Sequence, residues 1–253
     1  MPKKKSLEKI VFPGKGVVIG STPEGNPFGA YFITAKTSFN RQQRMVDVGP
    51  GIIVVEHLDP ARVTDDNIER LFYDAMISNG DALAIGNGNH TDAVLIRSIG
   101  AMAGLPLEKE MGAWSYGPGR ERAPRIMGRI LLESHHGGIM RNDTTCSFGM
   151  IYDVDGRAER RFYDGLMMDN DPPGFCRCLT THSGLRGPVL LPSDGGLLEF
   201  NVDSNEGERL CQELGDMLPR DFRVSVAVTA YKNRGDKAFR DFYPSFHILN
   251  YRG

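Results

Sequence analysis

The chain carries RVSVAVTAY at residues 223–231, a short run that is rich in β-branched and aromatic residues. Residues of this kind favour a β-strand. Eight more runs of the same character are spread along the chain: Gly16–Ile19, Ala30–Ala35, Ile52–Glu56, Ala82–Gly86, Arg125–Leu132, Ser147–Tyr152, Phe175–Thr181 and Ser245–Asn250. The sequence therefore predicts a fold with many short strands.

Helical patterns are fewer. Apolar side chains at helical spacing predict helices over Asp65–Ser78, Asp92–Ala103 and Asn205–Leu218. The residues expected to cap their starts are Thr64 or Asp65, Thr91 and Ser204. Strands and helices in this ratio do not alternate one for one, which argues against a doubly wound parallel sheet and predicts an α+β layered fold. Without an internal repeat or an obvious linker, we expect a single domain over residues 1–253.

The charge balance narrows the class of partner. Thirty basic and 32 acidic residues leave a formal charge of −2, which argues against a protein that coats nucleic acid but allows a local basic pocket. Arg outnumbers Lys by 21 to 9 among the basic residues. Arg suits bidentate contact with phosphate or carboxylate, although a bias in genomic base composition would produce the same surplus.

The remaining composition points to an intracellular setting. No apolar run has the length of a signal peptide or a membrane span, so we expect a cytoplasmic protein with reduced thiols and no membrane partner. A metal site is not predicted either. His135 and His136 are adjacent and would point to opposite faces of a strand, and Cys176 and Cys178 have no second ligand pair at metal spacing.

Residues 30–44, AYFITAKTSFNRQQR, form the first segment with functional character. A strand pattern runs into a polar stretch that holds the three cations Lys36, Arg41 and Arg44. Polar, cationic loops at strand ends are common places for anion recognition. A solvated hairpin is the alternative interpretation.

Residues 85–92, IGNGNHTD, lie between a predicted buried strand and a predicted helix. Free backbone N–H groups at such a turn suit a phosphate or a developing oxyanion. The segment has neither the Walker sequence nor the Rossmann glycine spacing. The alternative is a tight turn capped by Thr91, with Asp92 complementing the helix dipole, so Asp92 is given no catalytic role.

Arg125 begins a predicted strand and follows a loop rich in glycine and proline. That loop contains Trp114, Tyr116, Arg120, Glu121 and Arg122. An aromatic ring beside an Arg can stack on a purine-like ring while the guanidinium meets its carbonyl. A surface loop is the alternative, and it is the preferred interpretation for Arg120 and Arg122.

In their order and spacing, these segments resemble the archaeal-type IMP cyclohydrolase family, which also has bacterial relatives. The resemblance begins at FPGKGVVIG (residues 12–20). KTSFNR (36–41) stands where the family has Arg-Ser, two variable residues and Asn-Arg. NGNHTD (87–92) matches Asn-Gly-x-x-Thr-Asp, and APRI (123–126) stands for Thr-Pro-Arg-Ile. With weaker similarity at residues 174–182, the resemblance covers roughly residues 10 to 185.

The resemblance implies a four-layer αββα sandwich like that of N-terminal-nucleophile hydrolases, without self-processing. It also implies an enzyme, a hydrolase acting on cyclic amidine C–N bonds, that closes 5-formamidoimidazole-4-carboxamide ribonucleotide to IMP with loss of water in de novo purine biosynthesis. The implied partner is this purine ribonucleotide, with no metal or organic cofactor and no nucleic acid. Whether the chain forms a homo-oligomer is left open.

Ring closure needs groups that stabilise an oxyanion, move protons and hold a 5′-phosphate. On this basis catalytic roles are predicted for Tyr31, Arg41, Tyr116, Glu121 and Arg125. Substrate-binding roles are predicted for Lys36, Asn40, Arg44, Asn87, Gly88, Asn89 and Thr91. Lys36 replaces the family's Arg and loses its fork, and Ala123 replaces a Thr. These departures keep two alternatives open: an amidohydrolase or cyclase acting on a related ribonucleotide, and a non-catalytic nucleotide-binding protein.

Overall fold

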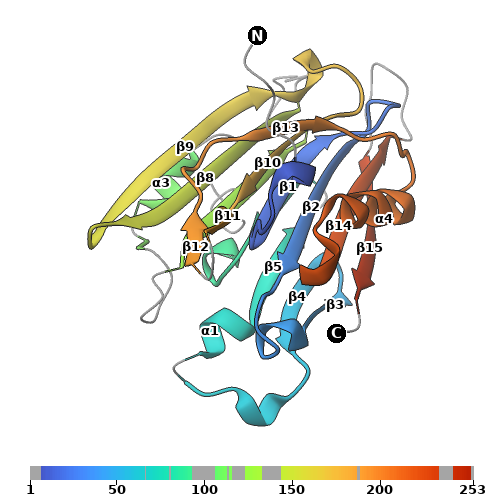
Figure 1. Cartoon of the computed structure of the whole chain (residues 1–253). Coiled ribbons are helices and arrows are strands. Elements are labelled where there is room, and N and C mark those ends of the chain that lie inside the picture. The colour runs from blue at the N-terminus through green and yellow to red at the C-terminus, as the bar shows by residue number, and fades with distance from the viewer. Residues whose placement is uncertain are drawn as a thin grey trace.

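The computed structural model describes residues 7–65, 67–79, 81–92, 106–112, 114–115, 123–132, 144–186, 189–233 and 242–251. Their strands form two large antiparallel sheets and one two-stranded ribbon (Figure 1). The fold is therefore α+β, as predicted. Among these residues, no helix is long and apolar enough to cross a membrane.

The six-stranded sheet is built from both ends of the chain. Its order is β13 (Leu198–Asn201), β10 (Phe175–Thr180), β1 (Lys15–Ser21), β2 (Pro27–Thr34), β14 (Arg223–Asn233) and β15 (Phe242–Asn250). The small ribbon pairs β11 (His182–Arg186) with β12 (Val189–Pro192).

The seven-stranded sheet is a meander in chain order. It comprises β3 (Gln43–Gly49), β4 (Ile52–His57), β5 (Tyr73–Ser78), β6 (Ala82–Gly86), β7 (Arg125–Leu131), β8 (Thr145–Val154) and β9 (Arg157–Met167). The α-helices with described bounds are α1 (Ile68–Leu71), α3 (Leu107–Met111) and α4 (Gly207–Met217). Short 3-10 turns cover Leu7–Lys9, Asn40–Gln42, Pro60–Arg62, Met168–Asn170 and Arg220–Phe222.

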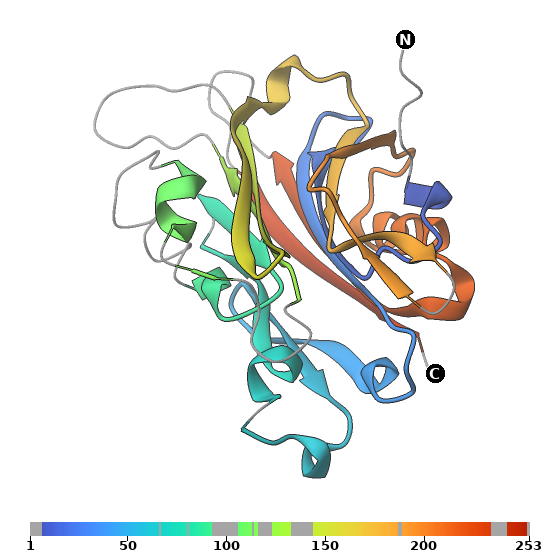
Figure 2. The same ribbon diagram turned by 60° about the vertical axis from the view of Figure 1, so that its left-hand side comes forward.

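The two large sheets stack face to face (Figure 2), and alternation along their strands produces three apolar clusters. Val17 and Tyr31 face the seven-stranded sheet and pack in the central core with residues such as Ile85. Their neighbours on the opposite face of the six-stranded sheet, such as Val18, pack under α4. On the outside of the seven-stranded sheet, α3 covers a third cluster that includes Met127. The order of layers is helix, sheet, sheet, helix.

The two sheets approach closely where glycine replaces a side chain. A Cβ on Gly29 would lie 2.5 Å from Leu83 Cδ2, and one on Gly128 would lie 2.4 Å from Val17 Cγ1. No real Cβ tolerates such distances, so these glycines allow the facing side chains to interdigitate.

All nine predicted strands are present, but one predicted helix is wrong. Asp65–Ser78 contains only the short helix α1, and its second half is β5. Nearly every residue of β5 is buried, and a strand buried on both faces shows no clear alternation of apolar and polar residues. Of Asp92–Ala103, the described part is confined to Asp92, which belongs to a helical segment at residues 90–92; the remainder lies outside the described residues.

The predicted C-terminal helix is confirmed as α4, although its cap is not Ser204. The N-cap position is Glu206, which makes no side-chain capping bond. Instead Glu213, within the helix, accepts the backbone N–H groups of Asp203 (2.8 Å) and Ser204 (3.1 Å) and so fixes the approach to the helix. All four cysteines are free and buried, which agrees with the expected lack of disulfides.

Candidate functional site

One edge of the sandwich collects the polar residues of interest. β1 begins there at Lys15, opposite the end of β10, because Gly16 pairs with Thr180. β7 begins at the same edge with Arg125, beside the turn that follows β6, since Gly86 pairs with Met127. The helix α1 lies at this edge too, directly before β5 (Figure 1).

An inner cluster lies between the sheets, around Lys15, Tyr31 and Tyr73. The Lys15 ammonium lies 4.5 Å from the centroid of the Tyr73 ring, and the Tyr73 hydroxyl lies 2.9 Å from that of Tyr31. Both tyrosines are buried, and burial raises the pKa of each phenol well above its ordinary value. Both therefore stay protonated, and because one hydroxyl donates to the other, one O–H remains to donate elsewhere.

Lys15 lies between two glycines in the chain, Gly14 and Gly16, and neither position has room for a side chain. A Cβ on Gly14, which has φ +74°, would lie 2.3 Å from Thr181 Oγ1, and one on Gly16 would lie 2.1 Å from the Phe32 ring. The Lys15 backbone N–H donates to Thr181 Oγ1 at 3.0 Å. Burial, together with the charge of Arg70, lowers the pKa of the Lys15 ammonium to about 7.

An outer cluster surrounds Arg125, which shares a strand face with Met127 on the outside of the seven-stranded sheet. Its Nε donates to the Ser115 carbonyl at 3.0 Å, and its guanidinium lies 5.2 Å from the centroid of the Trp114 ring. Glu69 of α1 forms an ion pair with Arg125 at 3.8 Å, and its side chain is 47% exposed. Burial lowers the pKa of Arg125, and Glu69 offsets part of that effect.

His90 connects the two clusters electrostatically. Its Nε2 lies 3.1 Å from the Ile126 carbonyl, and its Nδ1 lies 3.3 Å from Arg125 Nη1. A carbonyl can only accept, so Nε2 carries the proton and Nδ1 accepts from the guanidinium. Burial, the charge of Arg125 and the charge of Lys15 lower the pKa of His90 to about 3, which keeps the ring neutral.

The turn at residues 87–91 brings together several predicted site residues. Asn87 donates to the Pro124 carbonyl at 2.8 Å and accepts from the Ile126 N–H at 2.7 Å. Thr91 Oγ1 donates to the Gly88 carbonyl at 2.9 Å. A Cβ on Gly88 would lie 2.8 Å from Arg125 Nη1, so glycine allows the guanidinium to approach the turn. Both Asn87 and Thr91 hold the shape of the turn.

The predicted cations of residues 36–44 have other partners. Arg41 donates to the Asp221 carbonyl, and Arg44 forms an ion pair with Glu56 across β3 and β4. In the described part of the chain, these contacts do not join Arg41 or Arg44 to Arg125. Lys36, like Asn89, is exposed, while Asn40 is half-buried and its backbone N–H donates to Thr37 Oγ1. Tyr116 and Glu121 lie outside the described residues.

A carboxyl pair lies on the outer face beside this turn. Burial, and a hydrogen bond shared with Asp92, raise the pKa of Asp74 to about 6. Within the described ranges, no group of three or more His, Cys, Asp or Glu residues is arranged to hold a metal ion.

Sequence patterns gave no role to Lys15, Arg70, Tyr73 or His90. Lys is usually exposed, and only its place between two glycines marks Lys15 as unusual. Tyr73 lies within the predicted helix over Asp65–Ser78, so its place at the start of a strand was not expected. His90 belongs to the predicted turn, but its burial depends on β7, whose Ile126 carbonyl it contacts.

The fold and the site define a class of protein: an antiparallel two-sheet α+β protein with a candidate site at one edge of the sandwich. At that edge, Lys and Arg side chains lie near a neutral His and protonated Tyr side chains. A family model described as IMP cyclohydrolase-like protein matches residues 12–234, and the chain belongs to this family. The match extends beyond the resemblance recognised up to about residue 185. A search of curated proteins finds no significant match.

Proposed function

We propose that this protein is an IMP cyclohydrolase, which closes 5-formamidoimidazole-4-carboxamide ribonucleotide to IMP with loss of water in the cytoplasm. The observation that carries the proposal is the family match over residues 12–234. The order of layers, helix, sheet, sheet, helix, supports the further proposal that the fold is of the N-terminal-nucleophile-hydrolase type.

The charges of the site support an anionic substrate. Lys15, Arg70 and Arg125 gather at one edge, and the ion pair of Arg125 with Glu69 is long and involves a half-exposed carboxylate. Glu69 therefore neutralises the Arg125 guanidinium incompletely. A ribonucleotide phosphate is the complementary ligand, and the Arg125 fork suits bidentate contact with it or with the base carbonyl.

The neutral groups support ring closure. The carboxamide nitrogen attacks the formyl carbon, and the formyl oxygen gains negative charge in the transition state. The Tyr31–Tyr73 pair supplies an O–H donor that burial keeps protonated. Because the reacting arms belong to one molecule, holding them in contact supplies much of the rate enhancement.

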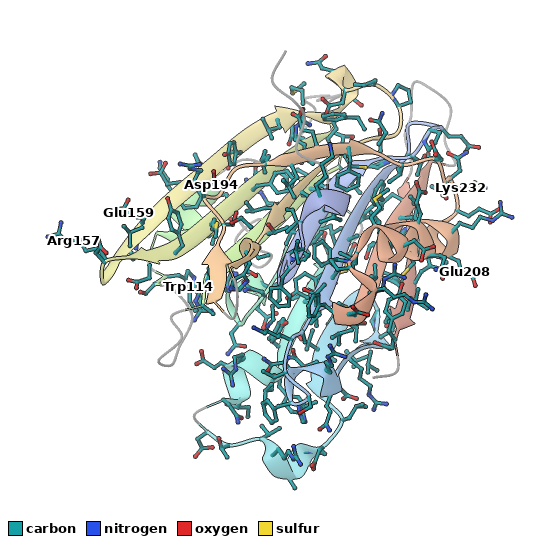
Figure 3. The ribbon with its side chains drawn as sticks, in the orientation of Figure 1. Trp114, Arg157, Glu159, Asp194, Glu208 and Lys232 are labelled. Carbon is teal, nitrogen blue, oxygen red and sulfur yellow. The ribbon has the colours of Figure 1, made fainter. Side chains whose placement is uncertain are left out.

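The test is direct conversion of the formamido nucleotide, followed by ultraviolet absorbance and chromatography of IMP. We expect IMP to form in proportion to enzyme concentration, and loss of that activity in Arg125→Met. Arg157→Met is the matched control, because Arg157 is exposed at the tip of the β8–β9 hairpin, away from Trp114 (Figure 3). Tight nucleotide binding in calorimetry without turnover would instead indicate a non-catalytic binding protein, and turnover of a related ribonucleotide alone would indicate another cyclase or amidohydrolase.

A further inference from the structure

Lys15 occupies an unusual environment for a lysine. It is the first residue of β1, and its ammonium lies over the Tyr73 ring on the inner side of the sandwich. Among the described residues, no carboxylate lies within ion-pair distance of it. The positive charge of Arg70 in α1 lowers the pKa of Lys15, and the charge of Lys15 lowers the pKa of His90 in the turn after β6. Among the described contacts, the π-face of Tyr73 is the group that favours the ammonium.

The histidines and tyrosines of the described site do not accept a proton near neutral pH. His90 is engaged at both ring nitrogens, and His182 Nδ1 lies 2.8 Å from Thr181 Oγ1. Burial lowers the pKa of His182 to about 4. Tyr31 and Tyr73 are already protonated. Glu69 lies against Arg125 on the other face of the seven-stranded sheet.

We propose that Lys15 is the catalytic residue that carries protons in ring closure, an assignment that rests on the proposed cyclohydrolase function. The reaction requires a group that accepts a proton from nitrogen and then donates it to oxygen. An amine that exchanges its proton near neutral pH fulfils both roles. Lys15 combines this property with a place at the start of β1, over the Tyr73 ring and beside the tyrosine O–H donor.

The step balances with Lys15 as the only carrier. The neutral amine accepts a proton from the carboxamide nitrogen as the C–N bond forms and the formyl C=O π bond breaks. The resulting ammonium passes that proton to the formyl oxygen. Lys15 then carries the proton of the formamido nitrogen to the departing hydroxyl as the C–O bond breaks and the ring C=N bond forms. The formyl oxygen leaves as water, and Lys15 returns to the amine.

Two substitutions separate proton transfer from phosphate binding. Lys15→Met should lower kcat by roughly 10²-fold or more. Lys15→Arg keeps the positive charge but cannot deprotonate, so it should restore KM and leave kcat low. Circular dichroism and the melting temperature verify that both variants fold. If Lys15→Arg recovers the wild-type kcat, Lys15 binds phosphate and the assignment is wrong.

The pH profile supplies a second readout. The wild-type kcat/KM should rise with pH through a midpoint near 7, because only the amine accepts a proton. The groups that face Lys15 are Arg70 from α1, Tyr73 from β5, Tyr31 from β2 and His90 from the turn after β6. The pKa of His90 is lowered to about 3 and the pKa of each tyrosine is raised, so none of these three groups produces the same limb. An unchanged limb in Lys15→Arg would overturn the proposal.

The pH dependence of chemical labelling tests the state of the amine without any turnover. The rate at which acetic anhydride labels Lys15, normalised to its own value at high pH, should have a midpoint near 7, because limited access slows the reaction at every pH without moving the midpoint. The exposed Lys109 and Lys232 are the internal references. Lys232 lies on the far side of the molecule from Trp114 (Figure 3). A midpoint for Lys15 equal to that of the references would contradict the assignment. A wild-type protein in which Lys15 has a midpoint near 7 but which forms no IMP would overturn the cyclohydrolase function itself, and with it the catalytic role of Lys15.

Discussion

Arg125 is fixed by groups of different chemistry. Its Nε meets the Ser115 carbonyl, one terminal nitrogen meets neutral His90, and the Trp114 ring lies beside its plane. A guanidinium can make these contacts together because its N–H donors are held in a rigid fork. These contacts fix the direction of the remaining N–H donors of the guanidinium. A phosphate or carbonyl ligand requires donors that point in a fixed direction.

Arg125→Lys should therefore lower the activity even though the substitution keeps the positive charge. We expect kcat/KM for IMP formation to fall by about 10²-fold, with folding retained, because a single ammonium cannot replace the fork. Arg157→Lys, at an exposed position, should leave the rate unchanged. Steady-state kinetics measure both, and equal rates for the two variants would remove Arg125 from the site.

At the residue scale, the sequence predicted contacts within one turn better than contacts between distant segments. Asn87, Gly88, Thr91 and Arg125 were predicted as site residues and lie together in the structure. Lys15 was not predicted, because its low pKa arises from burial between strands far apart in the chain. Neutral His90 has the same origin, since β7 and the turn enclose it.

Among the elements, α3 is attached to β7 by a buried ion pair. Arg129 Nη1 donates to Glu110 Oε1 at 2.8 Å, and the two side chains are 4% and 1% exposed. The pair anchors the short helix to the outer face of the seven-stranded sheet. Trp114 and Ser115 follow α3 closely, so the same pair positions the contacts of Arg125.

Breaking this pair should cost stability and site geometry together. We expect Glu110→Gln to lower the free energy of unfolding by roughly 3 kcal/mol, because it removes the negative charge that Glu110 places beside a buried guanidinium. The double variant Glu110→Leu with Arg129→Met should recover most of that loss. Urea unfolding measures each value. A single variant as stable as wild type would show that the pair does not anchor α3.

The elements themselves were predicted with uneven success. Nine strands were found, whereas β3, β5, β9, β11, β12 and β13 were not predicted as strands. The first half of β9 is dominated by charged side chains. Residues Arg157–Arg161 are mostly exposed and belong to an edge strand paired with β8. Edge strands often carry such charges because these oppose pairing with another chain.

At the scale of the whole molecule, Asp74 makes stability depend on pH. Its folded-state pKa of about 6 lies above the ordinary value of 3.8, so the folded state binds this proton more tightly than the unfolded state. The resulting stabilisation is present at pH values below 3.8 and is lost as the pH rises through about 6. Above that range, Asp74 and Asp92 repel each other.

Asp74→Asn should raise the melting temperature at about pH 8 and change it little at about pH 4, because Asn resembles the protonated acid. Asp203→Asn is the control, since Asp203 is exposed and distant from this pair. Differential scanning calorimetry across this pH range measures the effect. A gain for Asp74→Asn that is equal at both pH values would exclude this carboxyl as its source.

The order of strands has a consequence for biosynthesis. The seven-stranded sheet joins strands that follow one another in the chain, so each hairpin can form soon after it leaves the ribosome. The β1–β2 hairpin must instead wait for β10, because Gly16 pairs with Thr180, and for β14, whose residues also lie more than a hundred positions later. Such long-range pairing is slow and exposes apolar strands in the meantime. The nascent chain therefore passes through a stage in which one sheet is complete while the other is half made, and that interval is when it depends most on chaperones.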